Sequence, residues 1–379
     1  MKTERPYAIG SYCSSIAWAG LEMNVLRFLR WMKERGWETV AYAAPDTKIY
    51  ESAIETGQLV RPIRSGFRYG DIVNARRLAK QMAKDNVRIL SLHQSSDMFL
   101  GVLAKMMAPR DFKLIYSQHM HIGANKKDFF HSWEYRKFDA WITPVEWLAE
   151  RVMEKTVVSR DRIHVVPRGI ELDRFMHNRP TKADARERLD LPVDIKLAGI
   201  VGRLDVKKCQ DTVIRAMKRV HDQGQKLHLA IIGAKTRGEE TGYAEEIHRL
   251  VKELGLSDFV HFRPHLKQQE FGYAALDMFV LPSESETYGM VTVEALASGL
   301  PVIATAAGGT LSQISEGDNG LLYPPHDDEA LAECLMRLLL DNSLTKRLTE
   351  QAEKDALRLY SHTGQCEGWE SVFEKIAPE

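Results

Sequence analysis

Two glutamates, Glu286 and Glu294, stand eight residues apart in the stretch SESETYGMVTVEALASG, residues 283–299. An apolar run precedes the stretch and apolar residues recur at helical spacing in its second half, so we expect a strand, a loop and a helix. Carboxylates accept paired hydrogen bonds from vicinal hydroxyls, and each glutamate could therefore bind a sugar ring. The ordinary alternative is that Glu286 is a solvated loop acid and Glu294 a surface helix acid.

The turn between the two glutamates contains a glycine, Gly289. Because glycine has no Cβ, it allows the backbone to approach a ligand closely. If a helix begins here, the amides of Gly289, Met290 and Val291 have no partner within that helix. Such amides bind anions, and a diphosphate is a suitable one. The stretch could therefore hold a diphosphate between two carboxylates that bind hydroxyl groups.

Two cations, Arg203 and Lys208, follow another predicted strand in GIVGRLDVKKCQD, residues 199–211. Ligands of doubly wound α/β sheets bind outside the carboxyl ends of the strands. Arginine can clamp a phosphate with two hydrogen bonds, and lysine adds a mobile charge. The two side chains would suit the same diphosphate, although a solvated loop would also explain this spacing.

Three histidines end predicted strands in the first half: His93 in SLHQ, and His119 and His121 in YSQHMHIG. A histidine at a strand end can hydrogen-bond a sugar or a phosphate, or it can be a structural residue. No carboxylate or cysteine stands beside these histidines at a metal-ligand spacing, so we do not expect a metal site.

Several nucleotide-binding motifs are missing from the sequence. Gly20, in SSIAWAGLEMNVL, lies between the first predicted strand and a helix, and its amide could face a ligand there. The GxGxxG pattern of nicotinamide dehydrogenases is absent, as are a Walker A motif and an Asp-x-Asp metal motif. A dehydrogenase, an ATPase and a Mg²⁺-dependent transferase are therefore disfavoured.

The elements that would position these residues alternate along the chain. Runs such as TVAYA and LHLAIIG alternate with longer helical patterns, which predicts parallel sheets flanked by helices. We expect an α/β protein with two Rossmann-like, doubly wound domains and a ligand-binding cleft between them. The polar segment 176–192 is expected to link residues 1–180 to residues 181–361. The C-terminal helix, 362–379, is expected to cross back to the first domain.

Charge is divided unevenly, although the net charge is zero. Residues 1–180 hold 29 Lys and Arg against 20 Asp and Glu, which leaves 23 against 32 for residues 181–379. A basic half favours an anionic partner, although opposite charges could equally help two domains to dock. The run 61–88 is rich in arginine and lysine and suggests an anionic membrane surface. No stacking motif interleaves it, so nucleic acid is not expected as a partner.

Composition is typical of a globular protein, with 44% apolar and 27% charged residues. The longest apolar runs are far shorter than the roughly 20 residues that span a bilayer. The N-terminus lacks the apolar core of a signal peptide, and the four cysteines are scattered without a CxxC pair. We expect a cytoplasmic monomer with reduced cysteines, either free or peripheral on the inner face of the cytoplasmic membrane.

The order of these motifs resembles that of the family 4 glycosyltransferases of the GT-B fold, over nearly the whole chain. The Glu-x7-Glu pair is the most specific mark of that family, and VVPRGIELDRF and AAGGTLSQISEGDNGLLYP resemble further segments of it. Five positions depart from the family pattern: Arg168 and Glu171 replace Asn and Asp, Cys209 and Ala19 replace glycines, and Ser312 replaces a glutamate. The departure at Ser312 removes one possible contact to the sugar or phosphate of the donor and leaves the donor sugar less defined.

The resemblance implies a role for each candidate residue. Glu294 would hold the ribose hydroxyls, and Glu286 the hydroxyls of the transferred sugar. Arg203 and Lys208 would neutralise the diphosphate. The other contacts to the donor would come from the amides of Gly289, Met290 and Val291, from Gly20, from His119 (with His121 as the alternative), and from the backbone near Arg263 and Leu266, where the base would lie.

The resemblance also implies the reaction. The family retains anomeric configuration, so we expect a retaining, metal-independent transferase that uses a UDP or GDP sugar and no cofactor. The expected acceptor is a hydroxyl group of an envelope glycoconjugate, such as lipopolysaccharide core or a lipid-linked glycan. A sugar-nucleotide epimerase on the same scaffold and a non-catalytic nucleotide-sugar-binding protein remain alternatives.

Overall fold

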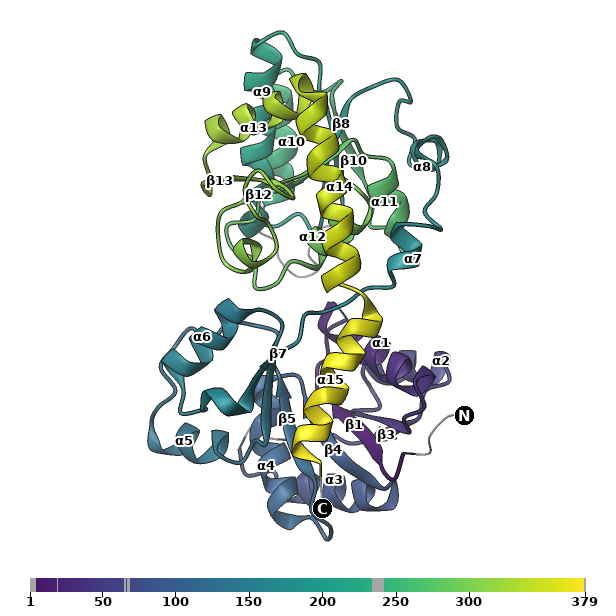
Figure 1. Ribbon diagram of the computed structural model, residues 1–379, viewed down its shortest axis with the longest axis vertical. Helices are drawn as coiled ribbons and strands as arrows, with labels where there is room; N and C mark the ends of the chain where they lie inside the picture. The colour runs from purple at the N-terminus through teal and green to yellow at the C-terminus, as the bar shows by residue number, and fades with distance from the viewer. Residues whose placement is uncertain (1–4, 19, 65, 67–68, 234–241, 378–379) are drawn as a thin grey trace. The chain divides into compact units, whose positions relative to one another are not determined.

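The computed structural model describes residues 5–18, 20–64, 66, 69–233 and 242–377. The chain divides into two compact units, Met1–Pro167 with His362–Glu379 and Arg168–Ser361. Each unit contains a parallel β-sheet covered by helices (Figure 1).

The first unit, over its described residues, has a seven-stranded parallel sheet in the order β3-β2-β1-β4-β5-β6-β7. Its strands are β1 Ala8–Tyr12, β2 Thr39–Ala43, β3 Val60–Pro62, β4 Val87–Leu92, β5 Lys113–Ser117, β6 Ala140–Thr143 and β7 Ile163–Val165. Its helices are α1 Gly20–Glu34, α2 Lys48–Glu55, α3 Ile72–Lys84, α4 Met98–Met107, α5 Phe129–Tyr135, α6 Glu146–Lys155 and α15 His362–Ile376.

The part of the second unit that the structure describes has a six-stranded parallel sheet in the order β10-β9-β8-β11-β12-β13. Its strands are β8 Leu197–Val201, β9 His228–Ile232, β10 Val260–Arg263, β11 Met278–Leu281, β12 Val302–Thr305 and β13 Leu321–Tyr323. Its helices are α7 Leu172–Phe175, α8 Lys182–Arg188, α9 Gln210–Asp222, α10 Tyr243–Glu253, α11 Glu270–Ala274, α12 Met290–Ala297, α13 Asp328–Leu340 and α14 Asn342–Leu359.

Both strand orders reverse direction once, between β1 and β4 in the first sheet and between β8 and β11 in the second. Loops that leave adjacent strands at such a point run to opposite faces of the sheet and open a crevice at the carboxyl edge. The predicted pair of doubly wound α/β sheets is therefore confirmed, and each sheet has one position at which a ligand would be expected.

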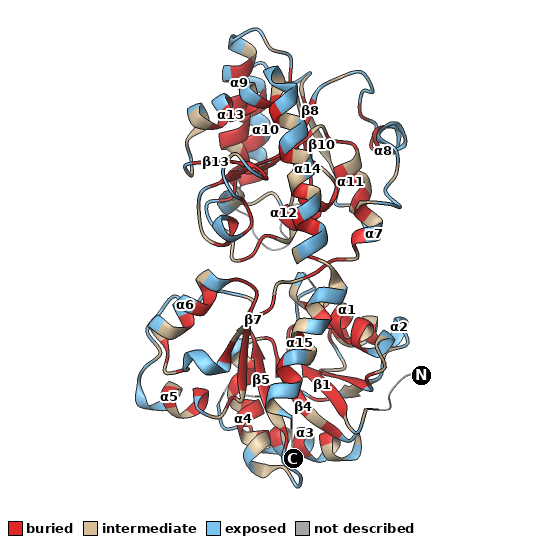
Figure 2. Ribbon diagram, viewed as in Figure 1, coloured by how far each residue is buried: buried red, intermediate tan, exposed pale blue. Residues whose placement is uncertain are grey.

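The central strands are buried, as expected for parallel sheets covered on both faces, whereas the edge strands β3, β7 and β10 are partly exposed (Figure 2). Four elements were not predicted from the sequence: α2, β3, α5 and α7. Each is short, and β3 is an edge strand of three residues that ends in Pro62. Short elements carry too few residues for a periodic pattern, so only tertiary contacts identify them.

The segment expected to link two domains belongs to the second unit. The chain divides between Pro167 and Arg168 rather than after residue 180, because α7 packs against α11 and α12. The polar segment 176–192 also contains a buried side chain, that of Arg186, which is 2% exposed. The boundary at 180 therefore differs from the observed one, and the reason is packing that the polar composition of the segment does not reveal.

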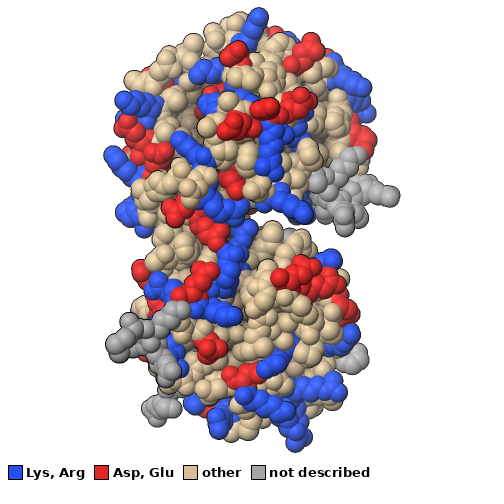
Figure 3. Space-filling model, turned by 90° about the vertical axis from the view of Figure 1, so that its right-hand side faces the viewer, with Lys and Arg blue, Asp and Glu red and all other residues tan. Residues whose placement is uncertain are grey.

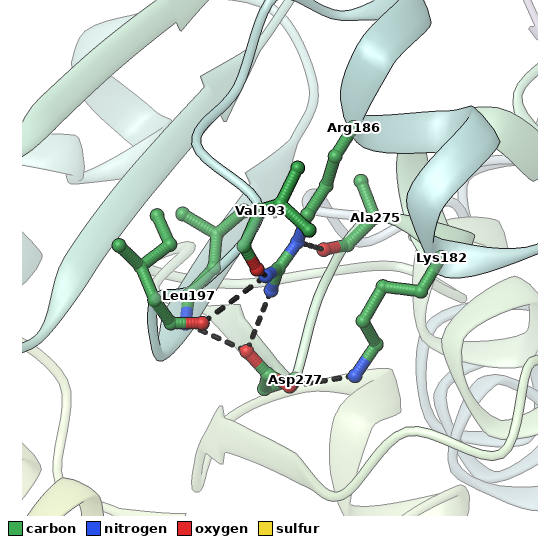
Figure 4. A network of polar contacts seen from close by, with 7 residues as sticks. Lys182, Arg186, Val193, Leu197, Ala275 and Asp277 are labelled. Atoms are coloured by element: carbon green, nitrogen blue, oxygen red, sulfur yellow. Dashed lines mark hydrogen bonds and ion pairs between the residues drawn. The ribbon is translucent and has the colours of Figure 1, made fainter.

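Arg186 joins α8 to the strands of the second sheet (Figure 4). Its guanidinium donates to the carbonyl groups of Val193 and Ala275 and lies 2.8 Å from the carboxylate of Asp277. Asp277 also accepts from the Leu197 amide and from Lys182, 2.8 and 2.6 Å away. Burial raises the pKa of Asp277, but these donors outweigh it and hold the pKa below its usual value.

The C-terminal helix α15 packs within the first unit. Trp369 lies 4.4 Å from Phe28, and Phe373 lies 5.4 Å from Trp37, measured between ring centroids. Helices α13 and α14, which precede α15 in the chain, belong to the second unit. Among the helices that the structure describes, none combines the length and apolar character needed to cross a membrane.

Candidate functional site

Lys208 and Glu286 form an ion pair at the reversal point of the second sheet. Lys208 follows β8 in a short 3-10 turn, Val206–Lys208, and Glu286 lies in the loop after β11. The carboxylate also accepts a hydrogen bond of 2.8 Å from the Ser283 hydroxyl. Two residues selected from separate motifs are thus in direct contact, and neither is a freely solvated loop residue.

The loop of Glu286 is held in place by the loop after β12. The Gly309 amide donates to the Glu286 carbonyl at 2.7 Å, and the Thr305 hydroxyl donates to the Ser283 carbonyl at 2.6 Å. Gly308 has a φ of 58°, and a Cβ there would lie 2.5 Å from the Glu286 carbonyl oxygen. A larger residue at this position would displace the Glu286 backbone, which explains the glycine pair in AAGGTLSQ.

Helix α12 begins beside Glu286, as predicted. Its N-terminal capping residue, Gly289, has a φ of 80°, a conformation that favours glycine. A Cβ on Gly289 would lie 3.7 Å from Glu286 Cβ, which places the first turn of the helix next to the ion pair. The amides of Met290 and Val291 precede the first intrahelical donors, so they remain the predicted anion-binding groups.

Glu294 is not the surface helix acid of the alternative interpretation, because it is only 5% exposed. The Tyr273 hydroxyl donates to its carboxylate at 2.7 Å, and the Gln269 side-chain amide can donate to both oxygens at 3.0 Å. Burial and the nearby carboxylate raise the pKa of the Tyr273 hydroxyl well above its usual value, so it remains a donor. Sequence reasoning missed Tyr273 and Gln269, since only the fold brings α11 beside α12.

Arg203 follows β8, and its side chain is exposed, 3.8 Å from Asp205. Its carbonyl accepts a hydrogen bond of 2.7 Å from the Gln210 side chain, which fixes the backbone but leaves the guanidinium in solvent. The structure therefore places Arg203 on the same edge of the sheet as the Lys208–Glu286 pair without a contact to it.

Arg263 ends β10, and the backbone near it was expected to contact the base. Its guanidinium donates to the carbonyl groups of Leu189 and Asp190, and its own carbonyl accepts from the Gly233 amide at 2.9 Å. Leu266 is half-buried, and a Cβ on Gly272 would lie 3.4 Å from it. Binding of the base against the backbone near Arg263 and Leu266 remains a prediction.

In the first unit, His119 pairs with His93. Nε2 of His119 lies 3.1 Å from Nδ1 of His93, and Nε2 of His93 lies 3.2 Å from the Ser91 hydroxyl. Ser91 lies 2.6 Å from Ser11 of β1, so the polar contacts run across the β1–β4 reversal point. His121 is instead exposed, 6.5 Å from the Trp147 ring centroid. The geometry favours His119 over His121 as the residue presented at the sheet edge.

Gly20 begins α1, and a Cβ there would meet nothing within 4 Å. Packing therefore does not require glycine here, which leaves close approach of a ligand as the predicted reason. Ala19 lies outside the described residues.

A buried carboxylate that sequence reasoning missed lies at the same edge of the first sheet. Asp97 is fully buried and accepts from the Ser14 amide at 3.1 Å and from the Ser14 hydroxyl. Burial raises the pKa of Asp97 to about 6, although the bonds from Ser14 act in the opposite direction. Ser14 follows β1 and Asp97 follows β4, so this contact fixes the two loops that flank the reversal point.

The second unit thus presents cations, a buried carboxylate and helix amides at one sheet edge, a combination suited to an anion attached to a polyol. Within the described ranges, no group of three or more His, Cys, Asp or Glu residues is placed to hold a metal ion.

Two family models match the chain. "Glycosyltransferase Family 4" matches residues 18–174, and "Glycosyl transferases group 1" matches residues 181–355. Among curated proteins, a D-inositol 3-phosphate glycosyltransferase of Streptomyces bingchenggensis is 34% identical over 63% of this chain and 52% of that protein. The enzyme of the same name from Corynebacterium jeikeium is 34% identical over 57% and 52%. The chain therefore spans about half the length of the curated relatives it matches.

Solved structures share the fold over almost the full chain. A glycosyltransferase from Rickettsia africae has a TM-score of 0.87 at 18% identity, covering 98% of both chains. Anabaena HepE in complex with UDP has a TM-score of 0.84 at 18% identity, covering 97% of this chain and 100% of that one. The lipopolysaccharide outer core galactosyltransferase WaaB has a TM-score of 0.74 at 15% identity, covering 97% and 99%. With both halves matched by family models and the fold shared throughout, the chain belongs to the family 4 glycosyltransferases of the GT-B fold.

Proposed function

We propose that this glycosyltransferase moves a sugar from a nucleoside diphosphate sugar to a hydroxyl group of an envelope glycoconjugate. It does so with retention of anomeric configuration, without a metal ion and without a cofactor. The observation that carries the proposal is the contact between Lys208 and Glu286 beside the first turn of α12. It brings together a cation for a diphosphate and an acceptor for sugar hydroxyls.

The reaction needs no protein nucleophile. Lys208, Arg203 and the first amides of α12 stabilise the charge that develops on the leaving diphosphate as the bond to the anomeric carbon breaks. The acceptor hydroxyl forms the new bond from the same face, and a phosphate oxygen of the leaving group takes its proton. Glu286 and Glu294 hold the transferred sugar and the ribose respectively.

The donor is a nucleotide sugar, and UDP-glucose is the first to test. HepE, which shares the fold, has been solved with UDP and with UDP-glucose. At 18 to 19% identity that likeness supports the choice of probe and leaves GDP sugars as the second arm of the experiment.

The acceptor is lipid-linked or part of lipopolysaccharide core, and an anionic membrane surface presents it. Support comes from the outer face of α3, where Ile72 and Val73 are exposed and Arg76, Arg77 and Lys80 follow one and two turns later. Apolar side chains beside cations on one helix face are typical of helices that lie at a bilayer surface.

The other arginines of the run 61–88 are less available to bind an anionic membrane. Arg61 is paired with Asp85 at 2.8 Å, and Arg64 with Asp46 at 3.1 Å. Arg68 lies outside the described residues. The membrane surface therefore rests on α3 rather than on the whole run.

The proposal is tested by screening UDP, GDP and their sugars by thermal shift, followed by NMR of the product formed with a lipopolysaccharide-core or lipid-linked acceptor. Retention predicts that the product keeps the anomeric configuration of the donor, and activity should persist in EDTA. Conversion of the donor sugar without an acceptor would instead identify an epimerase. Donor binding without any transfer would identify a binding protein.

The proposed contact between α3 and an anionic membrane is tested separately. Reversal of Arg76 and Arg77 to glutamate should reduce sedimentation with phosphatidylglycerol vesicles, while transfer to a soluble acceptor is unchanged. Equal sedimentation of the variant and the parent protein would show that α3 does not bind the membrane surface.

A further inference from the structure

A basic pocket of about 400 Å³ lies within the first unit, and its described lining includes none of the site residues assigned above. We define it by its charged lining, which among the described residues consists of Lys105, Lys113, Arg136, Lys137, Arg162, Lys375 and a single acid, Asp139. Lys113 begins β5, Asp139 precedes β6 and Arg162 precedes β7. The pocket is therefore at the amino-terminal edge of the sheet, whereas His119 is at the carboxyl edge.

Two of the cations build the wall of the basic pocket. Lys105 pairs with Asp139, whose carboxylate also accepts from the Leu114 amide at 2.7 Å. The Arg162 guanidinium donates to the carbonyl groups of Arg136 and Phe138, at 3.1 and 3.3 Å. These contacts fix the loop between α5 and β6, on which further pocket residues lie.

The other four cations have no such partner. Lys113, Arg136, Lys137 and Lys375 form no ion pair within the described part of the chain. Lys137 lies 5.9 Å from the centroid of the Trp133 ring, and Arg136 and Lys375 are exposed. Figure 3 shows Lys and Arg side chains gathered at the lower end of this unit, the end at which the chain terminates in Figure 1.

Helix ends account for only part of this charge. Helices α4, α5 and α15 all end near the basic pocket, since Lys105, Arg136 and Lys375 belong to their last turns or caps. A helix C-terminus is equivalent to roughly half a negative charge, so three of them offset about 1.5 charges. Six cations and one acid leave a net charge of five in the lining. Among the described residues of the lining, an excess of more than about three positive charges therefore remains without a counter-charge.

We propose that the basic pocket binds a ligand that carries more than one phosphate group, at a site separate from the donor site. A phosphate monoester carries about 1.5 to 2 negative charges, so a single one would not balance the excess. Arginine offers a planar fork to phosphate oxygens and lysine a mobile charge, and the unpaired residues include both. The source is either a soluble polyphosphate or the phosphate headgroups of a membrane.

The test uses tripolyphosphate as the soluble probe. It is titrated by calorimetry into the Arg203→Ala/Lys208→Ala protein, in which the cations of the donor site are removed. One saturable site is expected. Adding Arg136→Glu and Lys137→Glu should weaken it about 100-fold, because two charge-assisted contacts are lost. Adding Lys33→Glu and Lys226→Glu instead, two exposed lysines elsewhere, makes the same change of charge and should leave the affinity unchanged.

A second arm separates the two sources. Sedimentation with phosphatidylcholine vesicles, with and without phosphatidylglycerol, is measured for the same proteins. Loss of binding to the anionic vesicles in the Arg136/Lys137 variant alone identifies lipid headgroups, and unchanged vesicle binding identifies a soluble polyphosphate. Absence of saturable tripolyphosphate binding in the parent background overturns the proposal. Equal affinity in the Arg136/Lys137 variant does so as well, and an Arg136→Gln/Lys137→Gln protein serves if the reversed one fails to fold.

Discussion

Lys208 and Glu286 neutralise each other across the ends of β8 and β11. In the proposed reaction, Lys208 binds the diphosphate of the donor and Glu286 binds the transferred sugar. Donor binding must therefore redirect the Lys208 ammonium toward phosphate, which frees the carboxylate for hydroxyl groups. In the absence of donor, each of the two residues is the counter-charge of the other. Substitution of either one should therefore change how the other binds the donor.

Replacing Lys208 with alanine should weaken nucleoside diphosphate binding by about 10- to 100-fold, because a charge-assisted hydrogen bond is lost and Glu286 becomes an unpaired negative charge. Calorimetry with UDP measures the effect. Lys207→Ala is the matched control, since that neighbouring side chain is exposed. Equal losses in the two variants would show that only the overall charge of the loop matters.

Replacing Glu286 with glutamine should have a different effect on binding and on transfer. UDP should bind at least as tightly, since Lys208 loses its competing carboxylate, while transfer falls by about 100-fold because the sugar is held by a neutral group. Single-turnover kinetics alongside UDP titration separates the two quantities. Weaker UDP binding without a change in the rate of transfer would reverse the assigned roles.

Cys209 occupies a left-handed conformation, with φ 47° and ψ 43°, at the position where the family usually has glycine. Cys209→Val should lower the free energy of unfolding by about 2 kcal/mol or more, because β-branched residues are strongly disfavoured there. Cys209→Gly should stay within about 1 kcal/mol of the parent, since relief of strain offsets the lost thiol packing. Urea denaturation measures both, with Cys334→Val in helix α13 as the control. If the Val variant is as stable as the Gly variant, the backbone conformation at Cys209 is not strained.

Arg186 should be required for the stability of the second unit. Arg186→Met leaves Asp277 without its buried guanidinium partner and should cost about 3 to 5 kcal/mol. Arg188→Met, at an exposed position two residues later, should cost less than about 1 kcal/mol. Thermal denaturation distinguishes the two substitutions.

The same network predicts a pH dependence. The pKa of Asp277 is lowered in the folded protein, so its contribution is present above the ordinary carboxyl pKa near 4 and is lost as pH falls below that value. The difference between Arg186→Met and the parent should shrink in that acid range. A difference that stays constant with pH would show that Arg186 acts through packing alone.

Site residues that lie at the ends of strands could be predicted from the sequence. Contacts that depend on the packing of one helix against another could not. Arg203 and Lys208 follow β8 and Glu286 follows β11, and because these strands are parallel neighbours in the sheet, the residues after them lie at one edge. The partners of Glu294 could not be found in this way, because Tyr273 and Gln269 lie on a different helix whose position depends on the core.

Polar composition was misleading for Arg186, which is buried although its neighbours are exposed. A single buried arginine has no sequence signature, because its burial depends on carbonyl groups and a carboxylate contributed by other segments. His93 was visible at a strand end, but its contact with His119 depends on the spacing of β4 and β5.

Binding of ribose by Glu294 is the central claim about the donor site. Titration of UDP and GDP into the parent protein and into Glu294→Ala, with circular dichroism to confirm that both are folded, is the most direct measurement. The parent should bind one nucleotide in preference to the other, and Glu294→Ala should bind it at least about tenfold more weakly, because two hydrogen bonds from ribose hydroxyls are lost. A folded Glu294→Ala protein that binds the nucleotide as tightly as the parent would contradict the central claim.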